Sequence, residues 1–323
     1  MPMNRTFFKV HGSGNSFYLY NTSDENEMDW VKLTKWLCDK DNEGGADGLL
    51  LVLPSNHADA KMRVINADGS EASMCGNGLR CVARFVCDNL GLDKAVIETM
   101  KADLEVRKEH SIFEDIPTYA VEISPVSFEL SSLPMNYHNQ TEIKHQILKE
   151  FSPSIKFTAV SVPNPHLIGI VEKRYIEDTY HQKLLAQFLN SENDYCVDGV
   201  NVSYVHKLKN DTIFVRTFER GVGFTNACGT AMTASALVSK LNGLVDTNVV
   251  TVLNPGGFVK CEVIQKDTDA FELTLIGNAT IVSEYVLQTE QNNYQFINRK
   301  DTEEQKQYEK CIQLVNKELA SLS

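Results

Sequence analysis

Two cysteines, Cys75 and Cys228, each precede a glycine at the start of a stretch with helical periodicity. A thiol at a helix start lies beside backbone N–H groups that have no intrahelical partner, and beside the positive end of the helix dipole. Both effects stabilise a thiolate and lower the pKa of the thiol. The same N–H groups can bind a carboxylate. Each cysteine therefore predicts a proton-transfer group next to an anion-binding site.

The two cysteines occupy equivalent places in an internal repeat. Residues 74–86 read MCGNGLRCVARFV and residues 227–239 read ACGTAMTASALVS, with the cysteines 153 residues apart. In both copies Cys-Gly follows a polar loop and precedes a small polar residue and an apolar helix. The repeat predicts a duplicated half-domain with one thiol at each matching helix start.

Two facing thiols fit the inversion of an amino-acid α-carbon. Removing its weakly acidic proton requires the carboxylate to be held by preorganised donors in a site that excludes water. Inversion then needs a base on one face and an acid on the other, roles that a thiolate and a thiol can exchange. The sequence predicts this chemistry without a cofactor, and does not say which cysteine is the base for which enantiomer.

Composition and charge exclude several other classes. The 323-residue chain is 42% hydrophobic and 23% charged, as is usual for a soluble globular protein. Its net charge of −12, with no basic stripe, argues against a nucleic-acid partner. The sequence has no uncharged apolar run long enough to predict a membrane span. The N-terminal MPMNRTFF has no signal-peptide core, so we expect a reducing, cytoplasmic location.

The remaining cysteines and lysines suggest neither a metal nor a cofactor. The eight cysteines include no C-x-x-C pair, and Cys75, Cys81 and Cys87 recur every six residues, which is a poor spacing for metal ligands. No lysine stands in a convincing phosphate-loop context, which disfavours a pyridoxal phosphate racemase. Most of the cysteines are expected to be buried and inert.

The elements that must position the thiols are mostly strands. Runs rich in Val, Ile, Phe and Tyr recur from Phe7–Val10 to Phe271–Leu275, whereas the clear internal helical patterns are Met28–Cys38, Leu79–Asn89 and Ala231–Leu241. This pattern predicts an α+β fold with helices packed against curved, mostly antiparallel sheets. Residues 124–136, rich in Ser and Pro, predict the crossing between two halves, and the tail from Thr302 predicts a docking helix.

At this point the sequence resembles the diaminopimelate epimerases, cofactor-independent enzymes of lysine and peptidoglycan-precursor synthesis. The resemblance covers roughly residues 5–287, and the two Cys motifs with their flanks are highly specific together. The matching segments are FxKVHGSGNSF at 7–17, GADGLLLV at 45–52, NADGSEASMCGNGxRC at 66–81, PNPH at 163–166, GVNV at 199–202 and FERGVGxTxACGTA at 218–231.

The resemblance implies a fold of two pseudo-symmetric halves, each a small, mostly antiparallel sheet wrapped round a central helix, that close over substrate. We expect residues 1–126 with 276–323 to form the half that carries Cys75, and residues 127–275 to form the half that carries Cys228. The resemblance also implies a homodimer and a small-molecule substrate, diaminopimelate. The expected reaction is epimerisation of LL-2,6-diaminopimelate to the meso isomer.

Site residues follow from the resemblance position by position. The acid/base pair would be Cys75 and Cys228. Donors to the carboxylate at the reacting centre would be Gly76, Asn77, Gly229 and Thr230. The α-amino group there would be held by Asn15 and Glu219. The distal amino-carboxylate would be gripped by Asn66, Asn164, Asn201 and Arg220, and the planar fork of an arginine suits a carboxylate.

Individual residues have plainer interpretations. Four asparagines, Asn15, Asn66, Asn77 and Asn164, adjoin Gly, Pro or Ala and could be turn formers. We interpret His166 as a hydrogen-bonded structural histidine and His11 as a brace for the loop before Asn15. Local caps or pairs are expected for Arg80 and Arg84. Gly48 stands where many relatives have glutamine, so one side-chain contact near the site would be missing.

Two other functions remain open. Another racemase or epimerase of the same fold, acting on histidine, proline or hydroxyproline, would keep both cysteines and change the distal pocket. Four distal polar residues together favour a substrate with a second amino-carboxylate, because such groups would be costly to bury unpaired. A thiol redox sensor, with a reversible disulfide between Cys75 and Cys228, is the non-enzymatic alternative.

Overall fold

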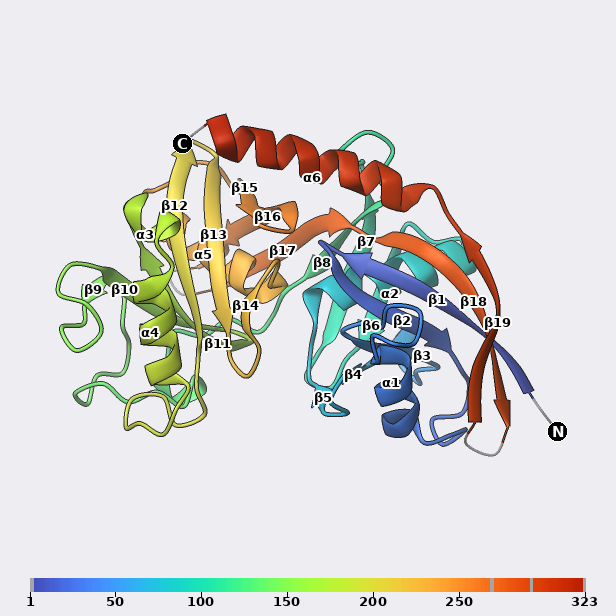
Figure 1. The fold of residues 1–323 in the computed structure, drawn as a ribbon. Coiled ribbons are helices and arrows are strands. Elements are labelled where there is room, and N and C mark those ends of the chain that lie inside the picture. The colour runs from blue at the N-terminus through green and yellow to red at the C-terminus, as the bar shows by residue number, and fades with distance from the viewer. Residues whose placement is uncertain (1–2, 268–269, 291–292, 322–323) are drawn as a thin grey trace. The chain divides into compact units, whose positions relative to one another are not determined.

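The chain divides into two compact units in a computed structural model that describes residues 3–267, 270–290 and 293–321 (Figure 1). The first unit comprises Met1–Val121 and Gly277–Leu314, and the second comprises Glu122–Ile276 and Val315–Ser323. The division expected from the sequence lies a few residues away at both crossings, and it placed the last residues with the first half.

The first unit is built mainly from strands. Its helices are α1 (Trp30–Cys38), α2 (Gly76–Leu90) and the start of α6 (Glu304–Ser321). Its strands are β1 (Met3–Gly12), β2 (Asn15–Asn21), β3 (Gly48–Leu53), β4 (Ala60–Asn66), β5 (Glu71–Ala72), β6 (Lys94–Glu98), β7 (Asp103–Glu109), β8 (Thr118–Glu122), β18 (Thr280–Glu290) and β19 (Asn293–Asp301).

The strands of this unit form one curved sheet round α2. They pair in the order β19-β18-β1-β2-β3-β4-β6-β7-β8, antiparallel except for β2–β3 and β4–β6. Helix α2 contacts β1, β2, β3, β4, β6 and β7. Strand β3 is buried on both faces, which suits its unbroken apolar sequence. Its Leu49, Leu51 and Leu53 join a cluster with α1.

The second unit has the same kinds of element. Its helices are α3 (Arg174–Glu177), α4 (Tyr180–Leu189) and α5 (Gly229–Leu241), with one 3₁₀ turn at Leu130–Ser132. Its strands are β9 (Gln146–Ile147), β10 (Lys156–Val162), β11 (Asn164–Ile170), β12 (Asn201–Lys209), β13 (Thr212–Glu219), β14 (Gly223–Thr225), β15 (Val249–Asn254), β16 (Gly257–Gln265) and β17 (Phe271–Asn278).

Strand pairing in the second unit repeats that of the first. The order is β9-β10-β11-β12-β13-β15-β16-β17, with parallel pairs β11–β12 and β13–β15 at the places of β2–β3 and β4–β6. The short strand β14 pairs with β13 as β5 pairs with β4. Helix α5 contacts β10, β11, β12, β13, β15 and β16. These matches confirm the α+β fold of two similar halves.

Each central helix begins immediately after a candidate cysteine. Helix α2 begins at Gly76 and α5 at Gly229, two or three residues before the apolar periodicity predicted. Every residue of α5 from Gly229 to Ser239 is buried, and its small Ala, Ser and Thr side chains let the surrounding strands approach. No helix among the described residues is long and apolar enough to cross a membrane.

Candidate active site

Cys75 is the N-cap residue of α2 in the first unit. Its backbone is extended (φ −143°, ψ 108°), and its Sγ accepts a hydrogen bond from the Gly78 backbone N–H at 3.4 Å. A Cβ at position 78 would lie 2.8 Å from Leu50 of β3, so glycine lets the first turn of α2 pack closely on the sheet. The thiol is half-buried.

Asn15, at the start of β2, orients the Cys75 thiol. The thiol donates to Asn15 Oδ1, with 3.7 Å between Sγ and Oδ1, and the side-chain amide of Asn77 donates to the same oxygen at 3.3 Å. The Asn15 amide nitrogen in turn donates to Asp47 Oδ2 at 2.9 Å. Three sequence-predicted residues, Asn15, Cys75 and Asn77, are therefore joined directly.

Arg80 supports the cluster of Asn15, Cys75 and Asn77 through hydrogen bonds. It was not predicted as a site residue. Its side chain is completely buried and donates to Asn77 Oδ1 at 3.1 Å, to Ser13 Oγ at 2.9 Å and to the Asn278 carbonyl at 3.1 Å. Only the bond to Asn77 is the local pairing expected for Arg80. Its place as the charged residue inside the CGNGxRC motif was the available signal.

Cys228 is the N-cap residue of α5 in the second unit and is 8% exposed. Its Sγ lies 3.5 Å from the Thr230 hydroxyl. Burial, and then the negative charge of Glu219, raise the pKa of the Cys228 thiol well above its ordinary value. The lowered pKa expected at a helix start is therefore wrong for this thiol, because desolvation outweighs the stabilisation that the helix start supplies.

The other predicted residues of the second unit make internal contacts. Asn201 Oδ1 accepts from the backbone N–H of Arg220 at 2.9 Å, and the Arg220 guanidinium donates to the Asp198 carbonyl at 2.8 Å. Thr225 donates its hydroxyl to Glu219. Asn164 begins β11 with a half-buried side chain. Asn201 thus braces the backbone beside an exposed arginine.

The predicted Asn66 belongs to the first unit, at the end of β4. Its backbone N–H donates to the Ser70 carbonyl at 2.8 Å, and its side-chain amide donates to Ser70 Oγ at 3.0 Å. These bonds are those of a turn-forming asparagine, which was the plainer interpretation of this residue.

The two histidines considered from the sequence differ in their outcomes. His11 Nδ1 accepts from the Gly14 backbone N–H at 3.2 Å, which confirms that His11 braces the loop before Asn15. His166 is fully buried, but neither ring nitrogen has a hydrogen-bond partner in the described part of the chain, so a hydrogen-bonded structural role is wrong. Burial, followed by the charge of Arg220, lowers the pKa of His166 to about 3.

Gly48 lies where a side chain would not fit this backbone. A Cβ at position 48 would be 2.6 Å from the Ile65 carbonyl oxygen of the neighbouring strand and 3.3 Å from the Phe17 ring. A glutamine here requires the pairing of β3 with β4 to shift. Over residues 3–267, 270–290 and 293–321, no group of three or more His, Cys, Asp or Glu side chains is arranged to hold a metal ion.

The structure thus gathers the predicted residues into two sets, one in each unit. At the start of α2, Gly76 and Asn77 are the first two helical residues; at the start of α5, Gly229 and Thr230 take the same places. Each thiol has a polar partner from a neighbouring strand, Asn15 for Cys75 and Glu219 for Cys228.

Relatives of this chain are found among known proteins. A model of the diaminopimelate epimerase family matches residues 7–114 and 158–282, which is more than half of the chain. The chain belongs to the diaminopimelate epimerase family. The diaminopimelate epimerase of Listeria innocua is 47% identical over 318 residues, covering 96% of this chain and 96% of that protein.

Solved structures show that the fold of the diaminopimelate epimerase family extends to distant sequences. A PhzF-family phenazine biosynthesis protein from Bacillus anthracis has a TM-score of 0.63 at 15% identity, covering 88% of this chain and 99% of its own. A hydroxyproline epimerase from Agrobacterium vitis, solved with trans-4-hydroxy-L-proline bound, has a TM-score of 0.58 at 14% identity, covering 88% and 91%.

Proposed function

We propose that this protein epimerises LL-2,6-diaminopimelate to meso-diaminopimelate without a cofactor, using Cys75 and Cys228 as the acid/base pair. The observation that carries the proposal is their equivalence, because each cysteine is the N-cap residue of the central helix in one of two units with the same strand order. Membership of the diaminopimelate epimerase family supports the substrate. The mechanism requires both sulfurs to reach opposite faces of one α-carbon.

The helix starts supply the carboxylate-binding donors. The backbone N–H groups of Gly76, Asn77, Gly229 and Thr230 are at the first two positions of α2 and α5, where helix geometry provides no carbonyl partner. Aimed at the substrate carboxylate, such donors stabilise the negative charge that builds up as the α-proton leaves. Asn15 and Glu219, beside the thiols, would hold the α-amino group.

The two thiols begin in different environments. Burial and Glu219 keep the pKa of Cys228 high, so we expect Cys228 to hold its proton in the substrate-free protein. It is then ready to donate to a carbanion whose proton has left from the other face. After one turnover the roles are exchanged, which reversible epimerisation requires.

Recognition of the distal amino-carboxylate rests on residues from both units. Arg220 has an exposed guanidinium whose Nη1 is anchored on the Asp198 carbonyl, and Asn201 fixes its backbone. An anchored guanidinium can offer its remaining N–H groups to a carboxylate in a bidentate pair. Asn66 and Asn164 complete the proposed contacts to the far amino-carboxylate.

The test is α-proton exchange in deuterated water with purified, reduced protein and no added cofactor. The substrates are LL-diaminopimelate, meso-diaminopimelate, histidine, proline and hydroxyproline, with NMR and chiral chromatography as readouts. We expect deuterium incorporation with stereoinversion for diaminopimelate alone. Cys75→Ala and Cys228→Ala should each lose at least about a hundredfold in rate, because general acid–base groups contribute on that scale.

A matched control uses Cys87, a buried thiol further along α2. Cys87→Ala should keep the wild-type exchange rate. Near-wild-type epimerisation by either Cys75→Ala or Cys228→Ala would rule out the two-thiol mechanism.

A second candidate is an epimerase for a different amino acid. The fold is shared with the hydroxyproline epimerase of Agrobacterium vitis, so the fold alone does not choose the substrate. Exchange with proline, hydroxyproline or histidine and not with diaminopimelate would favour this candidate. Absence of exchange with every amino acid would favour the thiol redox sensor. The homodimer and the cytoplasmic location stay predictions from the sequence.

A further inference from the structure

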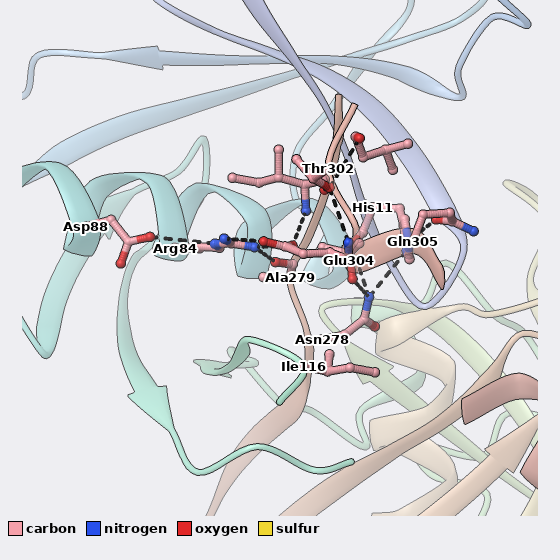
Figure 2. Close-up of polar contacts among 12 residues, drawn as sticks. His11, Arg84, Asp88, Ile116, Asn278, Ala279, Thr302, Glu304 and Gln305 are labelled. Carbon is pink, nitrogen blue, oxygen red and sulfur yellow. Dashed lines mark hydrogen bonds and ion pairs between the residues drawn. The ribbon is translucent and has the colours of Figure 1, made fainter. Parts of the chain in front are cut away.

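The start of α6 supplies two side chains that contact α2 and β1. The family match ends at residue 282, whereas Glu304 and Gln305 lie beyond it. Figure 2 shows Glu304 directed at Arg84 of α2 and Gln305 directed at His11 of β1. Both contacts lie within the first unit.

Glu304 ties the C-terminal segment to the Cys75 helix. Its carboxylate accepts from both terminal nitrogens of Arg84, at 2.6 and 2.8 Å, and from the Ile281 backbone N–H at 2.8 Å (Figure 2). Arg84 also donates to the Ala279 carbonyl at 2.7 Å. A bidentate pair of this kind fixes direction as well as distance. Because Arg84 lies on α2, the pair holds that helix in place along its axis.

Gln305 ties the same segment to the loop that carries Asn15. Because His11 Nδ1 accepts from the Gly14 N–H, the ring proton lies on Nε2, which donates to Gln305 Oε1 at 3.0 Å. Burial, opposed by the Gln305 hydrogen bond, lowers the pKa of His11 to about 4, so the ring is neutral at pH 7. Tyr308 of α6 packs against the ring at 4.5 Å.

Asn278 connects the contact between Gln305 and His11 to the candidate site. Its amide nitrogen donates to the His11 carbonyl at 3.2 Å, and its Oδ1 accepts from the Ser13 N–H at 2.8 Å. Its own carbonyl accepts from Arg80, which bonds Asn77 and, through it, the Asn15 oxygen that accepts from Cys75. A continuous chain of hydrogen bonds thus runs from Gln305 to the thiol.

We infer that Glu304 and Gln305 are positioning residues for Cys75, holding α2 and the Asn15 loop at a fixed separation so that the thiol keeps its contact with Asn15. The inference rests on the proposed role of Cys75 as a proton-transfer group. Neither side chain touches the thiol. Each acts through another residue, Glu304 through Arg84 and Gln305 through His11.

The surroundings of Gln305 decide which substitution is informative. An open cavity of about 570 Å³, lined by His11, Gly14, Gln305 and Tyr308 among others, adjoins the contact. Water from this cavity can replace a truncated Gln305 as the acceptor for His11, so alanine is a weak test. Gln305→Glu is a stronger test, because it places a negative charge beside His11 Nε2.

The first experiment compares Glu304→Gln with Glu303→Gln. Both remove one negative charge from adjacent positions, but Glu303 is exposed and pairs only with Lys306 among the ion pairs of the described residues. We expect Glu304→Gln to lower kcat for α-proton exchange about tenfold with KM within about twofold, since misplacement of a reacting group costs rate rather than binding. Glu303→Gln should match wild type.

The second experiment compares Gln305→Glu with Gln313→Glu, which adds the same charge to the lining of the same cavity, eight residues further along α6. The new carboxylate favours the imidazolium of His11, as Glu304 already does, whereas Arg80 opposes it. An imidazolium carries a proton on Nδ1 and can no longer accept from Gly14. We therefore expect the α-proton exchange rate of Gln305→Glu to fall, as the pH is lowered, at a pH about one unit higher than in wild type.

Alkylation of Cys75 separates this inference from the proposed function. Iodoacetamide labelling, followed by peptide mass spectrometry across pH 4.5 to 9, reports the state of the thiol without substrate. Glu304→Gln across this range, and Gln305→Glu below about pH 6, should change the labelling rate of Cys75 at least about threefold and that of Cys261 not at all, at temperatures where circular dichroism shows both variants folded.

The outcomes are distinct. Labelling and kcat equal to those of Glu303→Gln and Gln313→Glu would overturn the positioning role, whatever the substrate. Wild-type protein that exchanges no amino acid, combined with altered Cys75 labelling in the two variants, would overturn the proposed function and leave the positioning of the thiol standing. If Glu304→Gln does not fold, Gln305→Glu decides, because it retains the pair with Arg84.

Discussion

Asn15 Oδ1 accepts a hydrogen bond from the Cys75 thiol although the two residues are 60 positions apart in the chain. The opposite end of the Asn15 amide is held by Asp47. The oxygen is therefore kept toward the sulfur, and reversing the amide would break both contacts. An asparagine that looked like a turn former thus sets the environment of a candidate acid/base group.

Replacing Asn15 by aspartate should suppress the thiolate of Cys75. A carboxylate at this position lies beside both the sulfur and Asp47, and like charges at hydrogen-bond distance repel. We expect Asn15→Asp to slow iodoacetamide labelling of Cys75 at pH 7.5 about tenfold, as measured by peptide mass spectrometry. The control is Asn21→Asp at the exposed end of β2. Equal labelling in the two variants would contradict the orientation described.

Replacing Glu219 by glutamine should make Cys228 more reactive. The Glu219 charge contributes, after burial, to the raised pKa of this thiol, so removing the charge lowers that pKa and increases the thiolate at a fixed pH. We expect Glu219→Gln to label Cys228 several-fold faster at pH 8.5, with the exposed Glu272→Gln as control. Slower labelling in Glu219→Gln would show that Glu219 does not act through charge.

Acid should destabilise the protein through its buried histidines. The pKa values of His11 and His166 are lowered to about 4 and about 3. Unfolding therefore takes up protons when the pH is below the ordinary pKa of histidine. The contribution of these histidines to the free energy of unfolding is complete above pH 6.5. It falls by about 1.4 kcal/mol per pH unit for each histidine between pH 6.5 and 4. Urea unfolding of wild type across this range measures the slope.

His166→Gln gives the matched test of that slope. It removes one of the two buried titrating groups, so the fall in unfolding free energy from pH 6 to 4.5 should be about 2 kcal/mol smaller than in wild type. If His166→Gln has the wild-type slope, His166 is not a buried neutral histidine.

Placing a glutamine at position 48 should cost stability in this chain. A Cβ there meets the Ile65 carbonyl at 2.6 Å, a distance that ordinary side chains do not tolerate. We expect Gly48→Gln to lower the free energy of unfolding by about 1–3 kcal/mol, as overpacked interiors do, measured by urea denaturation. Gly48→Ala should show most of the loss, since the clash is at Cβ. An unchanged midpoint in both variants would contradict the prediction.

The starts of the two central helices could be predicted because Cys-Gly precedes a clear apolar period in each copy. The strands β10 and β11 could not, since Pro163 and Pro165 interrupt their pattern and proline usually argues against an internal strand. In the structure Pro165 pairs with Ser161 within an otherwise regular ladder.

Other features of the site could not be predicted because they depend on contacts between distant segments of the chain. The bond from Arg80 to Asn278 spans 198 positions, and no local pattern encodes it. The environment of Cys228 could not be predicted either, because the sequence shows where the helix starts but not how deeply the thiol is buried. Desolvation then reversed the predicted direction of its pKa shift.

Strand β1 pairs along its length with β18, setting Phe7 opposite Tyr285. During translation the whole of residues 122–276 leaves the ribosome before β18 exists, so the second unit can fold while β1 still lacks that partner. Domains that are continuous in the chain commonly fold in order of synthesis, and long-range strand pairing is slow. Cys75 is made long before Cys228, yet the sheet that surrounds it is completed last.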